Sequence, residues 1–256
     1  MKTEAALLFL ETLARAAGEV VLPYFRNPEL AVEQKSDRTP VTEADRRAEE
    51  VMRTMITRHH PGHGIIGEEF GTEKPDAEFV WVLDPIDGTK SFVAGVPLFG
   101  VLIGLLHAGR PVAGCIYQPV LEEMCLGGGG RAWLNGRPVR VREGVPLERA
   151  LVLCTDPAGV EAHQDYAAFE ALRRGAGLFR TWGDCYGYLL VASGRADVML
   201  DPVMNPWDLL PVIPVVEGAG GVVRGWTGGA ASDSSVAAPP LLCAEVCARL
   251  RGEPFK

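Results

Sequence analysis

The residues best suited to chemistry in this sequence lie just after an apolar run, residues 79–83. Asp84, Asp87 and Thr89 follow that run within a few positions. A continuously apolar run is typical of a strand covered on both faces, and Pro85 predicts that it does not continue as an interior strand. The carboxylates are therefore expected at a strand's C-terminal end. A divalent cation, a shared proton or a basic partner must offset their repulsion there.

Further acidic side chains at element ends favour a metal among these alternatives. Glu68 follows the short apolar pair at residues 65–66, at the end of another expected strand. Asp208 opens an apolar run that closes in a glycine-rich segment, so we expect it in the first turn of a helix. An Asp-x-x-Asp pair alone is as readily two turn caps, but the added carboxylates indicate a metal site. Oxygen ligands favour Mg²⁺, with Mn²⁺ as the alternative, over zinc.

These motifs resemble those of the inositol monophosphatase family of metal-dependent phosphatases. The resemblance is carried by Glu68 and Glu69, by residues 84–89, and by Trp207 and Asp208 followed by residues 217–221. It extends from about residue 35 to residue 221 and implies a layered α-β-α-β-α sandwich. Haloacid dehalogenase enzymes carry a similar strand ending in Asp-x-Asp-Gly-Thr. The spacing excludes them, because their two aspartates lie two positions apart and those of this chain lie three apart.

The resemblance assigns a role to each of these residues. It implies a cation held by carboxylates and one backbone carbonyl, contributed by Glu68, Asp84, Ile86, Asp87, Asp208 and, at a further metal position, Asp45. The expected nucleophile is a water activated by the metal and oriented by Glu68 and Thr89, with the Thr89 hydroxyl placed by Asp45. Asp45 also has a structural interpretation, because it stands where the acid of a capping box after Thr42 would stand.

Substrate contacts are expected around the metal. Gly88 permits phosphate to approach the N–H groups of Gly88 and Thr89 closely. The expected substrate-binding residues are Asp87, Gly88, Thr89, Gly183, Asp184, Cys185, Asp201 and Asp208. Residues 90–97 and 183–186 depart from the inositol-type pattern and resemble the histidinol-phosphatase branch of the family. Asp184 and Asp201 would there pair with the ammonium and imidazole of histidinol phosphate, although Asp184 is equally a candidate helix N-cap.

Three functions stay open on the sequence. The first is a Mg²⁺-dependent phosphomonoesterase that acts on histidinol phosphate. The second is an inositol-1-phosphate or broad-specificity sugar phosphatase, and the third is a non-catalytic, metal-dependent binding protein. The complete set of ligands argues against the third, because clustered carboxylates are costly to keep without a function.

Composition limits the setting of the site. The chain has 256 residues and a net charge of −8, which disfavours nucleic-acid binding because a polyanion would be repelled. The apolar residues 7–10 are flanked by charges, as in an amphipathic helix, so we expect a cytoplasmic protein without a membrane partner. The six cysteines are expected to be buried free thiols, and His59, His60 and His63 to lie in a solvated loop. The family resemblance favours a homodimer.

Hydrophobic periodicity and turn residues predict an α/β protein. Helices are expected at residues 4–22, 42–58, 161–174 and 184–193 and from 208, and strands at 99–106, 112–117, 123–126, 150–155, 178–181 and 197–201. Asn135 and Gly136 predict a two-residue hairpin turn, and glycines 127–130 a flexible connector. Residues 1–146 form an expected α+β half with the metal site, and residues 147–256 an α/β half that completes the substrate site.

Overall fold

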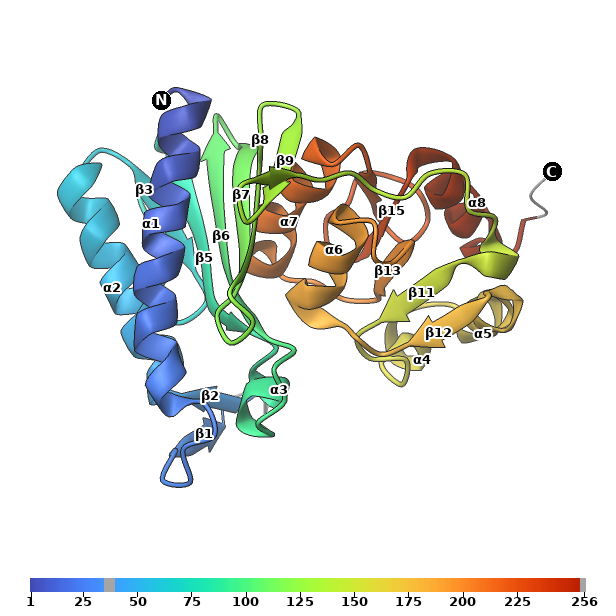
Figure 1. Ribbon diagram of the computed structural model, residues 1–256, viewed down its shortest axis with the longest axis horizontal. Coiled ribbons are helices and arrows are strands. Elements are labelled where there is room, and N and C mark those ends of the chain that lie inside the picture. The colour runs from blue at the N-terminus through green and yellow to red at the C-terminus, as the bar shows by residue number, and fades with distance from the viewer. Residues whose placement is uncertain (35–39, 254–256) are drawn as a thin grey trace.

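The molecule is built of alternating layers, in the order helices, sheet, helices, sheet, helices (Figure 1). This computed structural model describes residues 1–34 and 40–253. The helical layers are α1 (Thr3–Val21) with α2 (Glu43–His59), α6 (Asp184–Ala192) with α7 (Pro206–Gly218), and α5 (Tyr166–Gly175) with α8 (Pro240–Leu250). The α-β-α-β-α sandwich expected from the sequence is confirmed.

The first sheet joins eight strands in the order β10-β9-β8-β7-β6-β5-β3-β4. Neighbouring strands are antiparallel, except that β3 runs parallel to β5. The bounds are β3 Gly64–Gly67, β4 Gly71–Glu73, β5 Phe79–Asp87, β6 Gly100–His107, β7 Arg110–Gln118, β8 Glu123–Gly128, β9 Arg131–Leu134 and β10 Arg137–Pro138. Asn135 and Gly136, both at positive φ, form the predicted hairpin turn between β9 and β10.

The second sheet joins five strands in the order β12-β11-β13-β15-β14. Strand β11 runs parallel to β12 and β13, so the carboxyl ends of these strands are neighbours. The bounds are β11 Leu151–Cys154, β12 Leu178–Arg180, β13 Val198–Asp201, β14 Val222–Arg224 and β15 Ser235–Ala238. The other described elements are the paired strands β1 (Val32–Gln34) and β2 (Pro40–Thr42), the short helices α3 (Thr89–Val93) and α4 (Val160–His163), and the 3-10 turns Leu22–Tyr24 and Leu147–Arg149.

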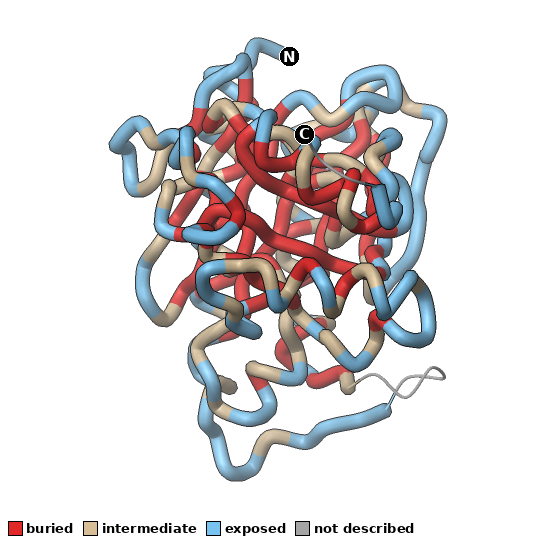
Figure 2. The backbone as a smooth tube through the Cα atoms, turned by 90° about the vertical axis from the view of Figure 1, so that its right-hand side faces the viewer, coloured by how far each residue is buried: buried red, intermediate tan, exposed pale blue. Residues whose placement is uncertain are grey.

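The central strands of both sheets are buried on both faces. Along β6, Val101 and Ile103 belong to the core under α1 and α2, whereas Leu102 belongs to the core shared with α6 and α7. Strand β11 alternates in the same way, with Leu153 toward the middle layer and Val152 toward α5 and α8. This explains why these strands are continuously apolar in sequence. Figure 2 shows the buried segments gathered in the middle of the molecule, with exposed segments around them.

A row of glycines lets α7 lie directly on the first sheet. Gly104, Gly114 and Gly127 are paired with one another across β6, β7 and β8. A Cβ atom at Gly114 would lie 2.0 Å from the carbonyl oxygen of Pro211, and one at Gly127 would lie 2.3 Å from that of Pro214. Both prolines belong to α7. Glycine is therefore needed at these positions for the helix to approach the strand backbones.

Three expected elements differ in the structure. Glycines 127 and 128 belong to β8 and the next two form its turn into β9, so the expected flexible connector is wrong. The expected strand end at Pro85 is wrong as well, because β5 continues to Asp87 through a bulge between Asp84 and Asp87. The expected helix at 161–174 is broken, because the Asp165 carboxylate caps α5 by accepting the N–H of Ala168 at 3.0 Å.

Two of the histidines expected in a solvated loop are built into the fold. The Trp81 indole N–H donates to His63 Nδ1 at 3.1 Å, and the rings of His63 and His60 stack with their centres 4.6 Å apart. Trp81 is fully buried in β5, so these imidazoles anchor the strand that carries the acidic motif. His59, the last residue of α2, is exposed as expected.

All six cysteines are free and buried, as the sequence predicts. The expected boundary between residues 146 and 147 falls between the last strand of the first sheet and the first strand of the second. Helix α7 crosses this division by packing on the first sheet. The division into two halves stays a prediction.

Candidate active site

Parallel pairing of β3 and β5 brings the first two acidic segments together. Gly67, the last residue of β3, is in register with Leu83 of β5. The N–H of Glu68 donates to the Leu83 carbonyl at 3.2 Å. Glu68, directly after β3, and Asp84, within β5, therefore lie at the same level of adjacent strands, and their side chains share a hydrogen bond.

The bulge in β5 adds Asp87 to this pair. Residues three apart in a regular strand project from opposite faces, so Asp84 and Asp87 would point apart without it. The register shift between them turns both carboxylates to the same place, and the first turn of α7 supplies Asp208. Carboxylate oxygens of Asp84, Asp87 and Asp208 lie within 4.8 Å of one another. The structure thus brings together three of the predicted ligands, with Glu68 beside Asp84, and their binding of a metal stays a prediction.

Burial and mutual repulsion make these carboxylates costly to ionise. Asp84 is only 2% exposed. Burial holds the pKa of Asp84 well above its usual value, and the charges of Glu68, Asp87 and Asp208 raise it further. The pKa of Asp87 is also raised strongly, first by burial and then by Asp184 and Asp208. A cation among these oxygens would offset both effects, and hard oxygen donors suit Mg²⁺.

Glu49 of α2 holds the turn that carries Glu68, and its only signal in the sequence is the i, i+4 spacing to Arg53. Its carboxylate is fully buried and forms an ion pair with Arg53 at 2.7 Å. It accepts the N–H of Glu69 at 2.7 Å and the N–H of Phe70 at 3.1 Å. The position of Glu68 therefore depends on the buried carboxylate of Glu49, which lies in α2 on the other side of β3 in the sequence.

Asp45 is the capping-box acid of α2, as its structural interpretation predicts. The Thr42 N–H and hydroxyl donate to Asp45 Oδ2 at 2.7 and 2.6 Å. Burial raises the pKa of Asp45 to about 6. The single hydroxyl proton of Thr89 is donated to the Ile86 carbonyl at 3.0 Å, so the expected placement of Thr89 by Asp45 is not formed. A metal position at Asp45 stays a prediction.

Asp87 and Asp208 also form one wall of a small cavity. It has a volume of about 80 Å³ and is completed by Thr155, Asp184, Tyr188, Asp201, Val203 and Met204. Burial raises the pKa of Asp201 to about 7 and that of Asp184 to about 6, with the Lys90 ammonium opposing the shift at Asp184. All the charged residues that line the cavity are acidic. Its chemistry suits a cation placed next to a metal site.

Asp184 is not the N-cap of α6, so that interpretation is wrong. Gly183 occupies the cap position, and Asp184 is the first helical residue with a φ of 49°. This left-handed conformation is strained for a residue with a side chain. The Asp184 carboxylate lies beside Gly88, where a Cβ would be 3.0 Å from its Oδ2. The Asp184 carboxylate therefore lies next to Gly88, one of the residues at which phosphate contact is expected.

Among the described residues, those that line the cavity do not include Gly183 and Cys185, which instead contact residues of its wall. A Cβ at Gly183 would lie 2.4 Å from the Cα of Thr155, so this position needs glycine. The Cys185 N–H donates to the Asp87 carboxylate at 2.5 Å. Both residues contact the cavity wall through Thr155 and Asp87, and their direct contact with a substrate stays a prediction.

Comparison with known proteins agrees with this geometry. A sequence model described as the inositol monophosphatase family matches residues 3–252. The chain belongs to this family. It is 45% identical over 210 residues to a histidinol-phosphatase of Chlorobaculum parvum, covering 82% of this chain and 81% of that one. It is 42% identical over 219 residues to the chloroplastic bifunctional phosphatase IMPL2 of Arabidopsis thaliana, covering 84% of this chain and 63% of that one.

A solved structure of an inositol monophosphatase from Zymomonas mobilis has the same fold. Its TM-score is 0.87 at 34% identity, over 97% of this chain and 98% of that one. Membership of the inositol monophosphatase family and the similarity to the histidinol-phosphatase identify the chain as a phosphoric monoester hydrolase. This favours the catalytic alternatives over a non-catalytic binding protein. Among the described residues, no helix is long and apolar enough to cross a membrane.

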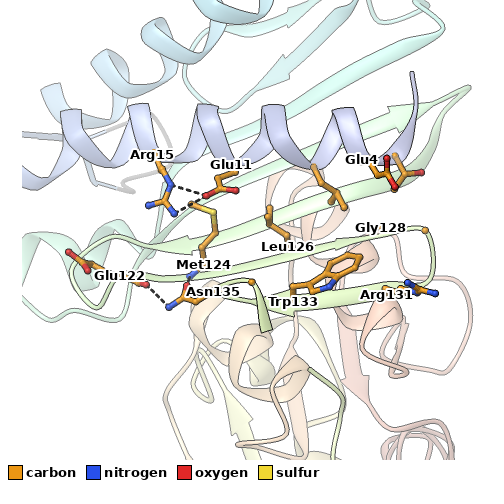
Figure 3. Close-up of a pocket in the computed structure, with 14 residues that line it drawn as sticks. Glu4, Glu11, Arg15, Glu122, Met124, Leu126, Gly128, Arg131, Trp133 and Asn135 are labelled. Carbon is orange, nitrogen blue, oxygen red and sulfur yellow. Dashed lines mark hydrogen bonds and ion pairs between the residues drawn. The ribbon is translucent and has the colours of Figure 1, made fainter. Parts of the chain in front are cut away.

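A second groove of this phosphatase lies between α1 and the β8–β9 hairpin (Figure 3). Its volume of about 940 Å³ far exceeds that of the acidic cavity. Figure 3 shows Glu11 and Arg15 paired across one turn of α1 above Met124, and the oxygen–nitrogen distance of the pair is 2.8 Å. None of the expected site residues lines this groove. Size alone does not mark the active site, because the clustered acids and the strained backbone lie at the smaller cavity.

Proposed function

We propose that this phosphatase hydrolyses histidinol phosphate with the aid of Mg²⁺. The observation that carries the proposal is the charge of the small cavity, where Asp184 and Asp201 join Asp87 and Asp208. Histidinol has an ammonium and an imidazole, and buried carboxylates bind such groups through charge-assisted hydrogen bonds. A neutral polyol has no charge to offset these acids. Similarity to the Chlorobaculum parvum histidinol-phosphatase supports the same choice.

The acidic cluster is the proposed metal site. Asp84, Asp87 and Asp208 would hold the ion, with Glu68 and the Ile86 carbonyl as further ligands. Their fit rests on the close oxygens and on the raised pKa values of Asp84 and Asp87, which burial and neighbouring charges cause. When bound, such an ion neutralises the carboxylates, polarises the phosphate and lowers the pKa of water.

The chain's own groups supply alignment for in-line attack on phosphorus. Glu68 would orient the attacking water and accept its proton. The N–H groups of Gly88 and Thr89 precede the first helical bond of α3, which runs from Phe92 N–H to the Gly88 carbonyl at 3.0 Å. We propose that these N–H groups donate to phosphate oxygens. The Thr89 hydroxyl ties the start of α3 to Ile86.

Inositol 1-phosphate is the second candidate substrate. The similarity to the Zymomonas mobilis inositol monophosphatase favours it. The Thr155 and Tyr188 hydroxyls at the cavity would suit a polyol, but both already bond to Asp201. Inositol 1-phosphate is therefore expected to be turned over less efficiently than histidinol phosphate.

The test is a comparison of kcat/KM for histidinol phosphate and inositol 1-phosphate, measured with Mg²⁺ on the wild type and on Asp184→Asn. We expect histidinol phosphate to be preferred and the preference to fall by about 10- to 100-fold in Asp184→Asn, since a charge-assisted hydrogen bond is lost. Asp76→Asn, at an exposed aspartate, is the matched control. A wild-type preference for inositol 1-phosphate would contradict the proposed substrate, and full turnover after exhaustive chelation would contradict the metal.

From the family resemblance we also propose a cytoplasmic homodimer. Light scattering should then give about twice the chain mass of 27.5 kDa. A mass equal to that of one chain across micromolar concentrations would contradict the dimer.

A further inference from the structure

We propose that Thr155 is a positioning residue for substrate selection. Its hydroxyl fixes the spacing between Asp184 and Asp201, and with it the shape of the pocket for the part of the substrate beyond the phosphate. This inference rests on the proposed phosphatase activity. Thr155 stands alone in the sequence, outside every motif, and only the structure brings it between the two acids.

Strand pairing places Thr155 beside Asp201. Cys154, the last residue of β11, is in register with Leu200 of the parallel strand β13. Thr155 directly follows β11 and Asp201 is the last residue of β13, so both lie at the carboxyl ends of these two strands. The Thr155 hydroxyl hydrogen-bonds to the Asp201 carboxylate there. This bond lowers the pKa of Asp201, which is the effect of a hydroxyl that donates to the carboxylate.

The same hydroxyl oxygen also holds Asp184. The Asp184 N–H donates to Thr155 Oγ1 at 2.8 Å. Asp184 has the left-handed φ of 49°, and Gly183 before it approaches Thr155 so closely that a Cβ would collide. A strained backbone of this kind persists only where its surroundings hold it. Thr155 thus links the two acids through one donated and one accepted hydrogen bond.

Tyr188 holds Asp201 from the other side. The Tyr188 hydroxyl donates to Asp201 Oδ2 at 2.6 Å and in turn accepts from the Ser235 hydroxyl. Tyr188 is 1% exposed, so this support is buried. Tyr188 fixes Asp201 alone, whereas Thr155 fixes Asp201 and Asp184 relative to each other. Loss of the Thr155 hydroxyl should therefore disturb the spacing more than loss of the Tyr188 hydroxyl.

The experiment compares Thr155→Val, Thr155→Ser and Tyr188→Phe in the Mg²⁺-loaded enzyme. KM and kcat are measured for histidinol phosphate, inositol 1-phosphate and 4-nitrophenyl phosphate, the last being an ester without the groups that the acids would bind. Thr155→Val should raise the KM for histidinol phosphate about tenfold or more relative to that for 4-nitrophenyl phosphate, with a smaller change in kcat. Thr155→Ser keeps the hydroxyl and should bring this ratio of KM values back close to that of the wild type. Tyr188→Phe should raise the ratio less than Thr155→Val does.

The controls separate this inference from the activity on which it rests. Thr57→Val makes the same change at an exposed threonine of α2. If Thr155→Val does not fold, Thr155→Ala carries the same expectation. Equal losses on all three esters, or a serine variant as impaired as the valine variant, would overturn the positioning role. A wild type that prefers inositol 1-phosphate would overturn only the proposed substrate. The effect of Thr155→Val would then be measured as the KM for inositol 1-phosphate relative to that for 4-nitrophenyl phosphate.

Discussion

Asp87 belongs to both parts of the active site. Its carboxylate lies in the cluster with Asp84 and Asp208, and it also lines the substrate cavity. One of its oxygens accepts the Cys185 N–H. Asparagine has nearly the same shape and keeps an acceptor for that N–H, so Asp87→Asn isolates the effect of the charge.

Asp87→Asn should abolish turnover and stabilise the metal-free protein. A lost metal ligand removes several kcal/mol of transition-state stabilisation, so we expect kcat to fall by about 100-fold or more. In EDTA the substitution removes a buried carboxyl that is costly to ionise beside other acids, and Tm should rise by about 2–4 °C for each kcal/mol gained. Paired measurements of kcat and Tm test this. A lower Tm in EDTA would show that Asp87 stabilises the fold even without a metal.

At the scale of elements, the site depends on how α7 and the turn after β3 are held. Asp208 reaches the cluster only because α7 lies on the glycine row, and Glu68 only because Glu49 holds its turn. Both supports lie outside the motifs of the sequence. Each can be altered without touching a proposed metal ligand.

Gly114→Ala should destabilise the protein and weaken metal binding together. A Cβ at this position would lie 2.0 Å from the Pro211 carbonyl oxygen, which is backbone and has little room to move. We expect a loss of about 1–3 kcal/mol, with Asp208 displaced along with α7. Urea unfolding and Mg²⁺ titration measure the two effects. Gly62→Ala is the control, because a Cβ there meets nothing within 4 Å.

Glu49→Gln should lower Mg²⁺ affinity by about 10- to 100-fold, as expected for a group that orients a ligand. Glutamine offers one acceptor oxygen, whereas Glu49 uses both oxygens for Arg53, Glu69 and Phe70. The exposed neighbour Glu50→Gln is the matched control. Equal metal affinity in the two variants would show that the turn holds Glu68 without Glu49.

Local chemistry made part of this structure predictable. The capping box of Thr42 and Asp45 and the hairpin turn at Asn135 are confirmed, because a few neighbouring residues determine each of them. The acidic ligands were predictable from residue types at strand ends. The glycine row was not, because it requires the register of three strands at once. Thr155 was missed for the same reason, since its partners come from β13 and α6.

At the scale of the whole molecule, the layers bury more acid than base near the site. Burial raises the pKa of Asp45 and Asp184 to about 6 and that of Asp201 to about 7, and it raises the pKa values of Asp84 and Asp87 strongly. Near β5 the opposite holds, because burial lowers the pKa values of His60 and His63. The two groups therefore make stability depend on pH with opposite signs.

The stability of the metal-free protein should fall as pH rises from about 4 to about 7. This window runs from the pKa of an aspartate in the unfolded chain to the raised pKa values of the buried aspartates in the folded protein. In that window the folded state binds more protons than the unfolded state, so the free energy of unfolding declines by about 1.4 kcal/mol per pH unit for each extra proton. The histidines oppose this only below their unfolded pKa of about 6.5, and the buried aspartates outnumber them. Saturating Mg²⁺ should flatten the decline, because bound metal favours the ionised carboxylates. Tm measured across this range in EDTA and in Mg²⁺ decides the matter, and a Tm in EDTA that rises with pH would show that the aspartates are not held protonated by the fold.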